Sequence, residues 1–292
     1  MSGSLADMSG RVCVVTGANR GIGRATAAGL ARLGADLVLV VRRRQEGEAV
    51  ARELPRARSA AEPEVVAADL SSQRAVREAV DAIRARHPCI HVLVNNAGTI
   101  PRRRETTVDG LETQFAVNHL APFLLTNLLL DALKAAAPSR VVIVSSGAHQ
   151  GGNLDFGDLQ SERRYDPVRV YGRTKLANVL FTYELAERLA GTGITANCVD
   201  PGLVATDLMR EHVLFRPRWL KAVWARVLAS PVAGARAAVH AASAPEIAAV
   251  TGKCFDRYGR HVRTSRQSRN PETRARLGTM SEKLTGVPFT TP

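Results

Sequence analysis

A chain of 292 residues is longer than most single domains, although α/β sheets of this size often form one domain. Hydrophobic residues make up 45% of the chain and charged residues 23%, which excludes wholesale disorder and leaves ample apolar material for a buried core. The net charge of +13 would suit a nucleic-acid partner, but the arginines are scattered and follow no zinc-finger, RRM or interleaved aromatic pattern. A solvated basic surface is therefore favoured over nucleic-acid binding.

The cysteines and the N-terminal residues bear on the compartment. Four widely spaced cysteines form no CxxC pair, so neither a disulfide framework nor a thiolate metal site is expected. Residues 1–10 lack the charged and apolar regions of a secretory signal, and no later run has the apolar length of a membrane span. We expect a cytoplasmic protein with no metal and no membrane span. The four cysteines are Cys13, Cys89, Cys198 and Cys254.

Short apolar runs, separated by helix-like stretches, indicate six strands along the chain. They cover residues 11–18, 36–41, 64–70, 91–98, 140–146 and 194–202. Their Val and Ile residues are continuous instead of alternating with polar residues, which is typical of strands buried on both faces. The predicted fold class is α/β, a doubly wound Rossmann-type parallel sheet with helices on both faces.

No Pro-, Gly- or Ser-rich linker and no internal repeat divides the chain, so we expect a single domain over residues 1–292. Residues 11–206 would form the cofactor-binding and catalytic core, 207–256 a substrate lid and the last elements, and 257–292 a basic tail. The tail arginines at every third position from 257 to 269 would spiral around a helix. A solvated, irregular surface is therefore favoured, and a surface for a polyanion stays open.

A glycine-rich turn at residues 16–23 directly follows the first strand and precedes a helix-like stretch. Such glycines let the backbone approach a pyrophosphate while helix N–H groups face it. The alternative is a glycine-rich turn that binds nothing. The predicted contacts from this turn are Gly17, Asn19, Arg20, Gly21, Ile22 and Gly23.

The end of the second strand indicates which nicotinamide cofactor binds. An NAD site usually has Asp or Glu there for the ribose hydroxyls, but Val41 is followed by Arg42, Arg43 and Arg44. An arginine fork suits the 2′-phosphate of NADP, and Arg20 could approach the same phosphate. We predict NADP (NADPH) with Arg42 as its selecting residue; the alternative is three solvated arginines that open a helix.

Six motifs in chain order resemble those of the short-chain dehydrogenase/reductase family over residues 11 to about 210. They are TGxxxGxG at 16–23, Asp69-Leu70, Asn95-Asn96-Ala97-Gly98, Ser145-Ser146, Tyr171 with Lys175, and Pro201-Gly202. The stretches 114–130 and 175–189 resemble the retinol-dehydrogenase-like branch. The resemblance implies an oxidoreductase that transfers hydride between nicotinamide and a carbonyl or alcohol.

The resemblance also implies further cofactor contacts. Asp69 and Leu70 would lie at the adenine, and Asn96 and Gly98 at the adenosine ribose. The nicotinamide end would be held by Pro201, Gly202, Val204 and Thr206. Taken singly, Asp69 could instead cap the following helix, and Pro201-Gly202 could be an ordinary turn.

Carbonyl reduction needs a proton donor beside the reacting oxygen, because the cofactor itself supplies the hydride. Tyr171 is the candidate acid/base, and Lys175 lies one helical turn later, where its ammonium would lower the pKa of Tyr171. The family implies a ribose contact for Lys175, a substrate-oxygen contact for Ser146, and a proton-relay water organised by Asn118. In isolation, Asn118 would be read as a local backbone partner.

A second tyrosine, Tyr165, lies in the same region but has Arg169 at the i+4 position and Pro167 between them. Arginine stays charged far above neutral pH, and proline argues against a continuous helix there. Tyr165 is therefore expected to be a loop residue without a catalytic role.

The substrate is indicated only by class. The 24 residues between Ser146 and Tyr171 should border the pocket, and an apolar carbonyl or alcohol is predicted from aromatic residues expected in the lid. The aromatic residues are Phe215, Trp219 and Trp224, and Val223 lies among them; helix-core packing is the alternative for all four. Arg102 to Arg104 could meet an anionic substrate, but a solvated loop is favoured. The membrane anchors of many animal relatives are not seen, which argues against a retinoid.

Two further alternatives stay open. A catalytically silent NADPH-binding sensor or scaffold would need the glycine-rich turn but no catalytic residues. The protein could also assemble as a homo-oligomer, on which the sequence gives no direct information.

Overall fold

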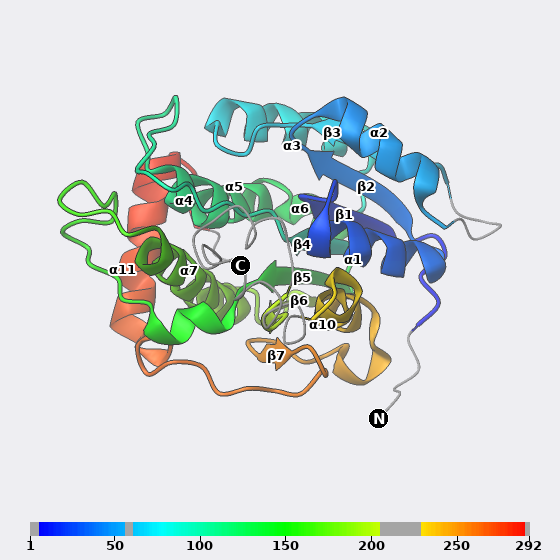
Figure 1. Ribbon diagram of the computed structural model, residues 1–292. Helices are drawn as coiled ribbons and strands as arrows, with labels where there is room; N and C mark the ends of the chain where they lie inside the picture. The colour runs from blue at the N-terminus through cyan, green and yellow to red at the C-terminus, as the bar shows by residue number, and fades with distance from the viewer. Residues whose placement is uncertain (1–5, 56–60, 205–228, 290–292) are drawn as a thin grey trace, which may run out of the picture.

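Parallel strands form a single sheet in the computed structural model, which describes residues 6–55, 61–204 and 229–289 (Figure 1). The sheet has seven strands in the order β3-β2-β1-β4-β5-β6-β7. Their bounds are β1 Val12–Thr16, β2 Asp36–Val41, β3 Glu64–Ala67, β4 Val92–Asn95, β5 Ser139–Val144, β6 Ile194–Asp200 and β7 Cys254–Asp256. Every neighbouring pair is parallel. The predicted doubly wound sheet is therefore confirmed.

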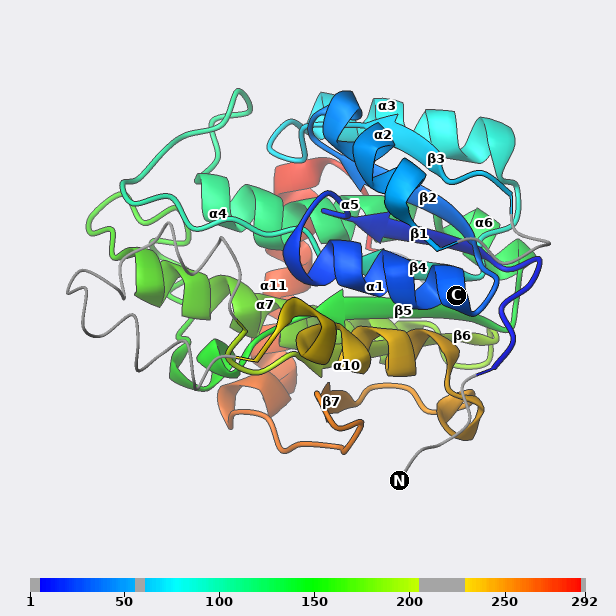
Figure 2. The same ribbon diagram turned by 45° about the vertical axis from the view of Figure 1, so that its right-hand side comes forward.

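Helices cover both faces of this sheet. The helices α1, α2 and α10 pack on one face, and α3, α5 and α7 pack on the other (Figure 2). The α-helices are α1 Gly21–Arg32, α2 Arg44–Glu53, α3 Gln73–Arg86, α4 Thr113–Phe115, α5 Ala121–Leu128, α6 Leu130–Ala135, α7 Pro167–Arg188, α10 Pro231–Ser243 and α11 Pro271–Thr285. The other helical segments are η1 Ala116–Leu120, η2 Gly147–Gly151, η3 Pro245–Ile247 and η4 Gln267–Arg269.

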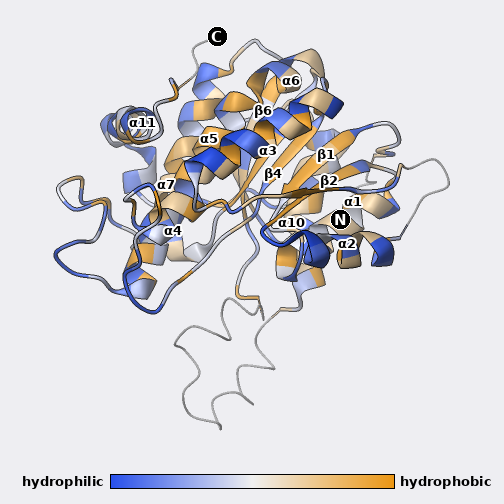
Figure 3. Ribbon diagram, turned by 90° about the horizontal axis from the view of Figure 1, so that it is seen from above, coloured by the Kyte–Doolittle hydropathy of each residue, from blue (hydrophilic) through white to orange (hydrophobic). Residues whose placement is uncertain are grey.

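The core lies in two layers, one on each side of the sheet. Strand residues alternate between them, so that Val14 and Leu93 pack toward α3 and α5 while Val15 and Val94 pack toward α1 and α10. Figure 3 shows the result, hydrophobic strands enclosed by helices with hydrophilic outer faces. Full burial of one such side chain contributes roughly 1.5–3 kcal/mol, which explains why strands with apolar residues on both faces are stable only when covered on both sides.

The six strands expected from the sequence are all present, and β7 was missed. It is only three residues long and lies at the sheet edge, where it pairs with β6 through Cys198 and Cys254. Its apolar residues are too few to be distinguished from a loop by pattern alone.

Helix α7 carries both Tyr171 and Lys175, and its start is well defined. The Asp166 side chain accepts hydrogen bonds from the backbone N–H groups of Val168 and Arg169, and Pro167 occupies the first helical position. Tyr165 therefore lies in the preceding loop, as the proline predicted.

Part of the expected irregular tail is instead an ordered helix, α11, which lies beside α7 (Figure 1). Asn270 caps α11, and Leu277 is buried in its face toward α7. Beyond the helix, the Phe289 ring lies 5.4 Å from the ring of Phe181 and its carbonyl accepts a 2.9 Å hydrogen bond from Arg188. The prediction failed because it considered the arginine spacing of residues 257–269 and not the apolar residues that follow.

None of the helices in the described part of the chain combines the length and apolarity needed to cross a membrane.

Candidate active site

The strand order reverses direction between β1 and β4, which is where sheets of this kind have a crevice. From β1 the chain runs outward to β2 and β3, and from β4 it runs outward in the other direction, so helices leave these two neighbours toward opposite faces. In such sheets, ligands bind outside the carboxyl ends of the strands at this switch point. The predicted site residues follow the carboxyl ends of β1 to β6, except for three that lie in the helical segments η1 and α7, namely Asn118, Tyr171 and Lys175.

The glycine-rich turn after β1 is packed too tightly for side chains. Gly17 has φ +65°, and a Cβ there would lie 2.9 Å from the Cα of Ala97. A Cβ at Gly23 would collide with the carbonyl of Gly17. The start of α1 can therefore approach a bound group through its backbone, which is the geometry that a pyrophosphate needs.

Asn96 holds this turn in place. Its side-chain amide donates to the carbonyl oxygen of Thr16 at 2.8 Å, and its backbone N–H donates to the Thr16 hydroxyl at 2.9 Å. The same hydroxyl accepts from the N–H of Ala97 at 3.0 Å. Asn96 was predicted as a ribose contact, and in this structure its amide is engaged in joining the ends of β1 and β4.

The arginines near the turn differ in what they contact. Arg42 and Arg20 are exposed at the end of β2 and at the start of α1. Arg43 forms an ion pair with Glu46, whose other carboxylate oxygen accepts from Asn19 at 2.7 Å. Arg44 donates to the carbonyl oxygen of Val65 at 3.0 Å. Of the three consecutive arginines, Arg43 and Arg44 therefore already have partners within the protein.

Asp69 and Leu70, which were predicted at the adenine, lie after the end of β3. The Asp69 carboxylate accepts from the backbone N–H and hydroxyl of Ser71 at 2.9 and 2.8 Å, which closes a local turn. Ser72 is the residue that caps α3, so the alternative of Asp69 as a helix cap is wrong. Leu70 is half-buried against the core.

Tyr171, Lys175 and Ser146 come together at the ends of β5 and α7. The Lys175 Nζ atom lies 5.4 Å from the centre of the Tyr171 ring and donates to the carbonyl oxygen of Val144 at 2.9 Å. The Ser146 hydroxyl is near enough to the Tyr171 phenol to lower its pKa. Tyr171 is half-buried and Lys175 is only 3% exposed. A partly exposed tyrosine is thus combined with a buried ammonium.

Burial controls the charge states of this pair. It raises the pKa of Tyr171 to about 12, against a lowering contribution from the Ser146 hydrogen bond and a raising one from Asp200. It lowers the pKa of Lys175 to about 8, and the Asp200 carboxylate opposes that change. The expectation that Lys175 lowers the pKa of Tyr171 is not met, because desolvation dominates and the ammonium is bonded to Val144.

Asn118 lies in a π-helical turn, η1, between α4 and α5. Its side chain donates to the carbonyl of Thr99 at 3.0 Å and to the Thr174 hydroxyl at 3.1 Å, and it accepts from the N–H of Thr99 at 2.8 Å. These bonds cross between segments, so the reading of Asn118 as a partner of its own helix is wrong. π-Helical turns within helices often occur at functional sites.

Gly98 lies close to the side chains of both Asn118 and Lys175. A Cβ at Gly98 would lie 3.4 Å from the Asn118 side-chain oxygen and 3.9 Å from the Lys175 Nζ atom. The glycine thus leaves open space between these two polar groups.

The segment after β6 approaches the glycine-rich turn. Pro201 is buried, and the backbone N–H of Gly202 donates to Asp200 at 2.9 Å. Val204 is buried, and its side chain and that of Ile22 both lie against Gly234 of α10. Thr206 and the predicted lid residues Phe215, Trp219, Val223 and Trp224 lie outside the described residues.

The long segment before α7 is tied to the loop after β4. The Tyr165 hydroxyl donates to the carbonyl of Pro101 at 2.7 Å and accepts from the Gln114 amide at 2.8 Å. The Arg104 side chain donates to the carbonyl of Gln160 at 2.8 Å. Arg104 is therefore a tether and not part of a freely solvated loop.

Sequence reasoning missed two residues that the structure places around Tyr171 and Lys175. They are Thr174 and Asp200. A carboxylate directly before Pro201-Gly202 was the one available signal, and it was read only as the end of a strand.

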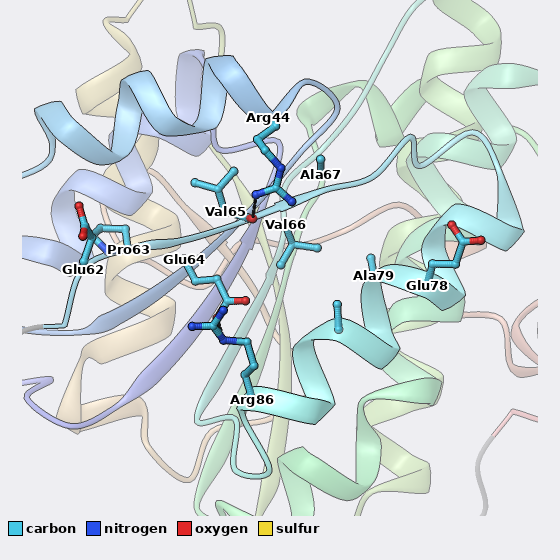
Figure 4. Close-up of a pocket in the computed structure, with 11 residues that line it drawn as sticks. Arg44, Glu62, Pro63, Glu64, Val65, Val66, Ala67, Glu78, Ala79 and Arg86 are labelled. Carbon is cyan, nitrogen blue, oxygen red and sulfur yellow. Dashed lines mark hydrogen bonds and ion pairs between the residues drawn. The ribbon is translucent and has the colours of Figure 1, made fainter.

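A separate groove of about 470 Å³ lies along the outer edge of β3, between α2 and α3 (Figure 4). None of the predicted site residues lines it. In this groove the Arg44 side chain donates a hydrogen bond to the carbonyl oxygen of Val65, and Arg86 forms an ion pair with Glu64 at 3.2 Å. These contacts protect the open edge of the sheet from pairing with another strand.

Comparison with known proteins agrees with this fold. A model of the short chain dehydrogenase family matches residues 11–215. The chain belongs to that family, in its retinol-dehydrogenase-like branch. It is 45% identical over 264 residues to retinol dehydrogenase 14 of Homo sapiens, an alignment that covers 85% of this chain and 78% of the relative.

Two solved structures are similar to this one. An uncharacterised protein from Mycobacterium paratuberculosis has a TM-score of 0.80 and 35% identity, with 98% of this chain and 97% of that chain covered. The active-site complex of RhlG from Pseudomonas aeruginosa with NADP has a TM-score of 0.69 and 27% identity, with 86% and 95% covered. The chain is thus an oxidoreductase of a family that binds a nicotinamide cofactor.

Proposed function

We propose that this protein is an NADP(H)-dependent oxidoreductase that transfers hydride between nicotinamide and an apolar carbonyl or alcohol. The observation that carries the proposal is the joining of Tyr171, Lys175 and Ser146 beside the switch-point crevice, with Asn118 linked to them through Thr174. A silent NADPH-binding scaffold would not require this arrangement.

The crevice fits a dinucleotide. Gly17 and Gly23 leave no room for a Cβ, so backbone forms the surface of the turn. The ends of β1 and β4 are joined by Asn96, which fixes that surface. Bound NADP(H) would supply or accept the hydride. We assign the phosphates to the turn at residues 16–23, the adenosine to Asp69, Leu70 and Gly98, and the nicotinamide end to residues 201–206.

The preference for NADP rests on Arg42. It is exposed immediately after β2, with no carboxylate at Val41, while Arg43 and Arg44 are engaged elsewhere. Glu46 is a nearby carboxylate that contacts Arg43 through one oxygen and Asn19 through the other, and its ion pair with Arg43 offsets its repulsion of a phosphate. Arg20, at the start of α1, would approach the same phosphate.

Each catalytic residue has a separate task in carbonyl reduction. Tyr171, held as a phenol by burial, donates its proton to the carbonyl oxygen, and Ser146 holds that oxygen by a hydrogen bond. Lys175 returns a proton toward Tyr171 and would contact the ribose. Asn118 places its side-chain oxygen near Gly98 and Lys175, where it can orient a water that links the ammonium to solvent. In alcohol oxidation the proton moves in the opposite direction.

The substrate class comes from the family and the sequence. The similar retinol dehydrogenase and the aromatic residues at 215–224 favour an apolar substrate. If Phe215 and Trp219 line a lid, their replacement by Ala should raise the Michaelis constant for accepted substrates. Unchanged Michaelis constants in folded variants would remove the lid hypothesis.

We also infer a single domain and a cytoplasmic location. The first rests on one sheet that includes strands from Val12 to Asp256. The second rests on Cys13, Cys89, Cys198 and Cys254, which are all free thiols, as is usual in a reducing compartment.

The test of this function is turnover. The protein is mixed with NADPH or NADH and a panel of aliphatic, aromatic and isoprenoid aldehydes and ketones, while nicotinamide absorbance is followed. Reproducible oxidation of NADPH that is absent from Tyr171→Phe supports the enzyme. NADPH binding without turnover for any substrate, in either direction, would favour the silent scaffold.

A further inference from the structure

The ammonium of Lys175 is buried in a manner that requires a countercharge. Its residue is 3% exposed, and its Nζ atom donates to one neutral partner, the carbonyl oxygen of Val144, at 2.9 Å. An ammonium removed from water without a negative charge nearby is strongly destabilised, and such a group usually loses its proton instead. The relay proposed above needs Lys175 to be charged.

Asp200 lies at the position where this countercharge is needed. In the β5–β6 register Val144 pairs with Val199, so Asp200 is one residue beyond the carbonyl that holds the ammonium. One Asp200 carboxylate oxygen accepts from the N–H of Gly202 at 2.9 Å. The other, Oδ2, lies 3.3 Å from where a Cβ would stand on Gly147, the residue after Ser146.

The Oδ2 atom is free of hydrogen bonds within the described residues, so this carboxylate is not neutralised locally. It forms no contact ion pair with Lys175 in the described part of the chain either, so its charge acts on the ammonium at longer range. A charge held by one backbone hydrogen bond keeps its orientation while its second oxygen faces the site.

The other ionisable groups around the site have hydrogen-bond partners of their own. Asp256 pairs with Asp200 in the sheet register, but Arg260 donates to it at 2.8 and 2.9 Å. Arg257 lies against Gly202 and donates to the Tyr258 hydroxyl. His149 is bonded through Nδ1 to the carbonyl of Ser146 at 2.6 Å. Among these groups, only Asp200 offers an uncompensated negative charge.

We propose that Asp200 is the counter-ion of Lys175, a positioning residue that keeps the buried ammonium protonated near neutral pH and so keeps the proton relay charged. This role rests on the proposed function and adds to the four residues predicted from the sequence. Asp200 transfers no proton itself, since its charge acts through Lys175 and Tyr171.

The directions of the pKa shifts agree with this role. Burial lowers the pKa of Lys175 to about 8, and Asp200 acts in the raising direction. Asp200 also raises the pKa of Tyr171, because a second negative charge beside it is unfavourable. Removing the carboxylate charge should therefore lower the proton affinity of both groups.

The scarcity of lysine makes a direct test practicable. The chain contains five lysines, Lys134, Lys175, Lys221, Lys253 and Lys283. Isotope-labelled lysine in the full-length protein would give few side-chain NMR signals, and Lys175→Arg identifies the signal of residue 175. Its chemical shift is followed against pH in the unmodified protein and in Asp200→Asn, which keeps the acceptor for Gly202 and removes the charge.

We expect the Lys175 titration to move down by about one pH unit or more in Asp200→Asn. In Asp200→Glu it should stay nearer to that of the unmodified protein. The matched control is Asp256→Asn, in the paired position of β7, which should leave the Lys175 titration in place. If Asp200→Asn does not fold, Asp200→Ser is used for the same comparison.

An unchanged Lys175 titration in Asp200→Asn, or an equal shift in Asp256→Asn, would overturn the role. Because the measurement needs neither cofactor nor turnover, it is independent of whether the proposed activity is found. Where the activity is found, the pH profile of kcat/KM for alcohol oxidation should move to lower pH in Asp200→Asn, and an unmoved profile would contradict the role.

Discussion

The Nζ atom of Lys175 lies 5.4 Å from the centre of the Tyr171 ring, yet its hydrogen bond goes to the carbonyl of Val144 in the adjacent strand β5. The lysine therefore connects the helix that carries the tyrosine to the end of β5, two residues before Ser146. The distance between phenol and ammonium is fixed by the packing of α7 on the sheet and not by a direct bond between the two groups.

Replacing Tyr171 by Phe should lower turnover at least about a hundredfold, because the proton donor is lost, while NADPH affinity is largely kept. Tyr165→Phe is the matched control. It loses bonds to Pro101 and Gln114 but no proton donor, so its effect on turnover should be mild. Steady-state kinetics with fluorescence-detected NADPH binding compare the two. Near-normal turnover in Tyr171→Phe would contradict the mechanism.

Arg42→Ala should weaken NADPH binding and leave NADH binding nearly unchanged. Loss of one charge-assisted contact costs about 1.5–3 kcal/mol, which corresponds to roughly tenfold or more in the preference for NADPH. Arg43→Ala is the control, because that side chain is already paired with Glu46. Equal affinity of the unmodified protein for both cofactors would reject the NADP assignment.

Asn118→Ala removes the acceptor and donors that join η1 to Thr99 and Thr174. Leaving buried partners unsatisfied should cost about 1–3 kcal/mol in the free energy of unfolding, together with a loss of turnover. Thr174→Val keeps the bonds to Thr99 and should be milder in both respects. Denaturant unfolding and steady-state rates measure the pair, and an unaltered rate in Asn118→Ala would remove Asn118 from the relay.

His119 should make the protein less stable in acid. It is buried between Phe115 and Phe181, and burial lowers its pKa to about 4 from 6.5. The unfolded chain then binds the proton more tightly, so stability is full above about pH 6.5 and is lost as the pH falls toward 4. The loss from this one group amounts to about 3 kcal/mol.

Unfolding by denaturant at several pH values tests this dependence. His119→Gln keeps a donor for Ser281 and should flatten the acid limb, whereas His261→Gln, at an exposed histidine, should not. An acid limb of equal steepness in the protein and in His119→Gln would assign the acid loss to other groups.

The sequence predicted the fold well because buried parallel strands leave a strong signal. Continuous Val and Ile runs identified the strands as far as β6, since residues covered on both faces must be apolar whatever their partners. The edge strand β7 left no such signal, because three residues with one neighbour need little apolar surface.

The site was predictable in its residues but not in its electrostatics. Spacing placed Tyr171 and Lys175 on one helix face, which the structure confirms. Charge states depend on burial and on groups distant in sequence, such as Asp200 on β6, and no local pattern shows these. The dual bonding of Asn118 to Thr99 likewise depends on how η1 packs.

The contact of α11 and Phe289 with α7 has a consequence for how the protein is made. Tyr171 and Lys175 lie in the first part of α7, and its last part packs on Phe289 through Phe181 and Arg188. A ribosome completes the strands β1 to β6 and the whole of α7 roughly ninety residues before Phe289 is joined to the chain. During that interval the face of α7 that receives Phe289 is uncovered, so a nascent chain can hold every catalytic residue and still present apolar surface to chaperones.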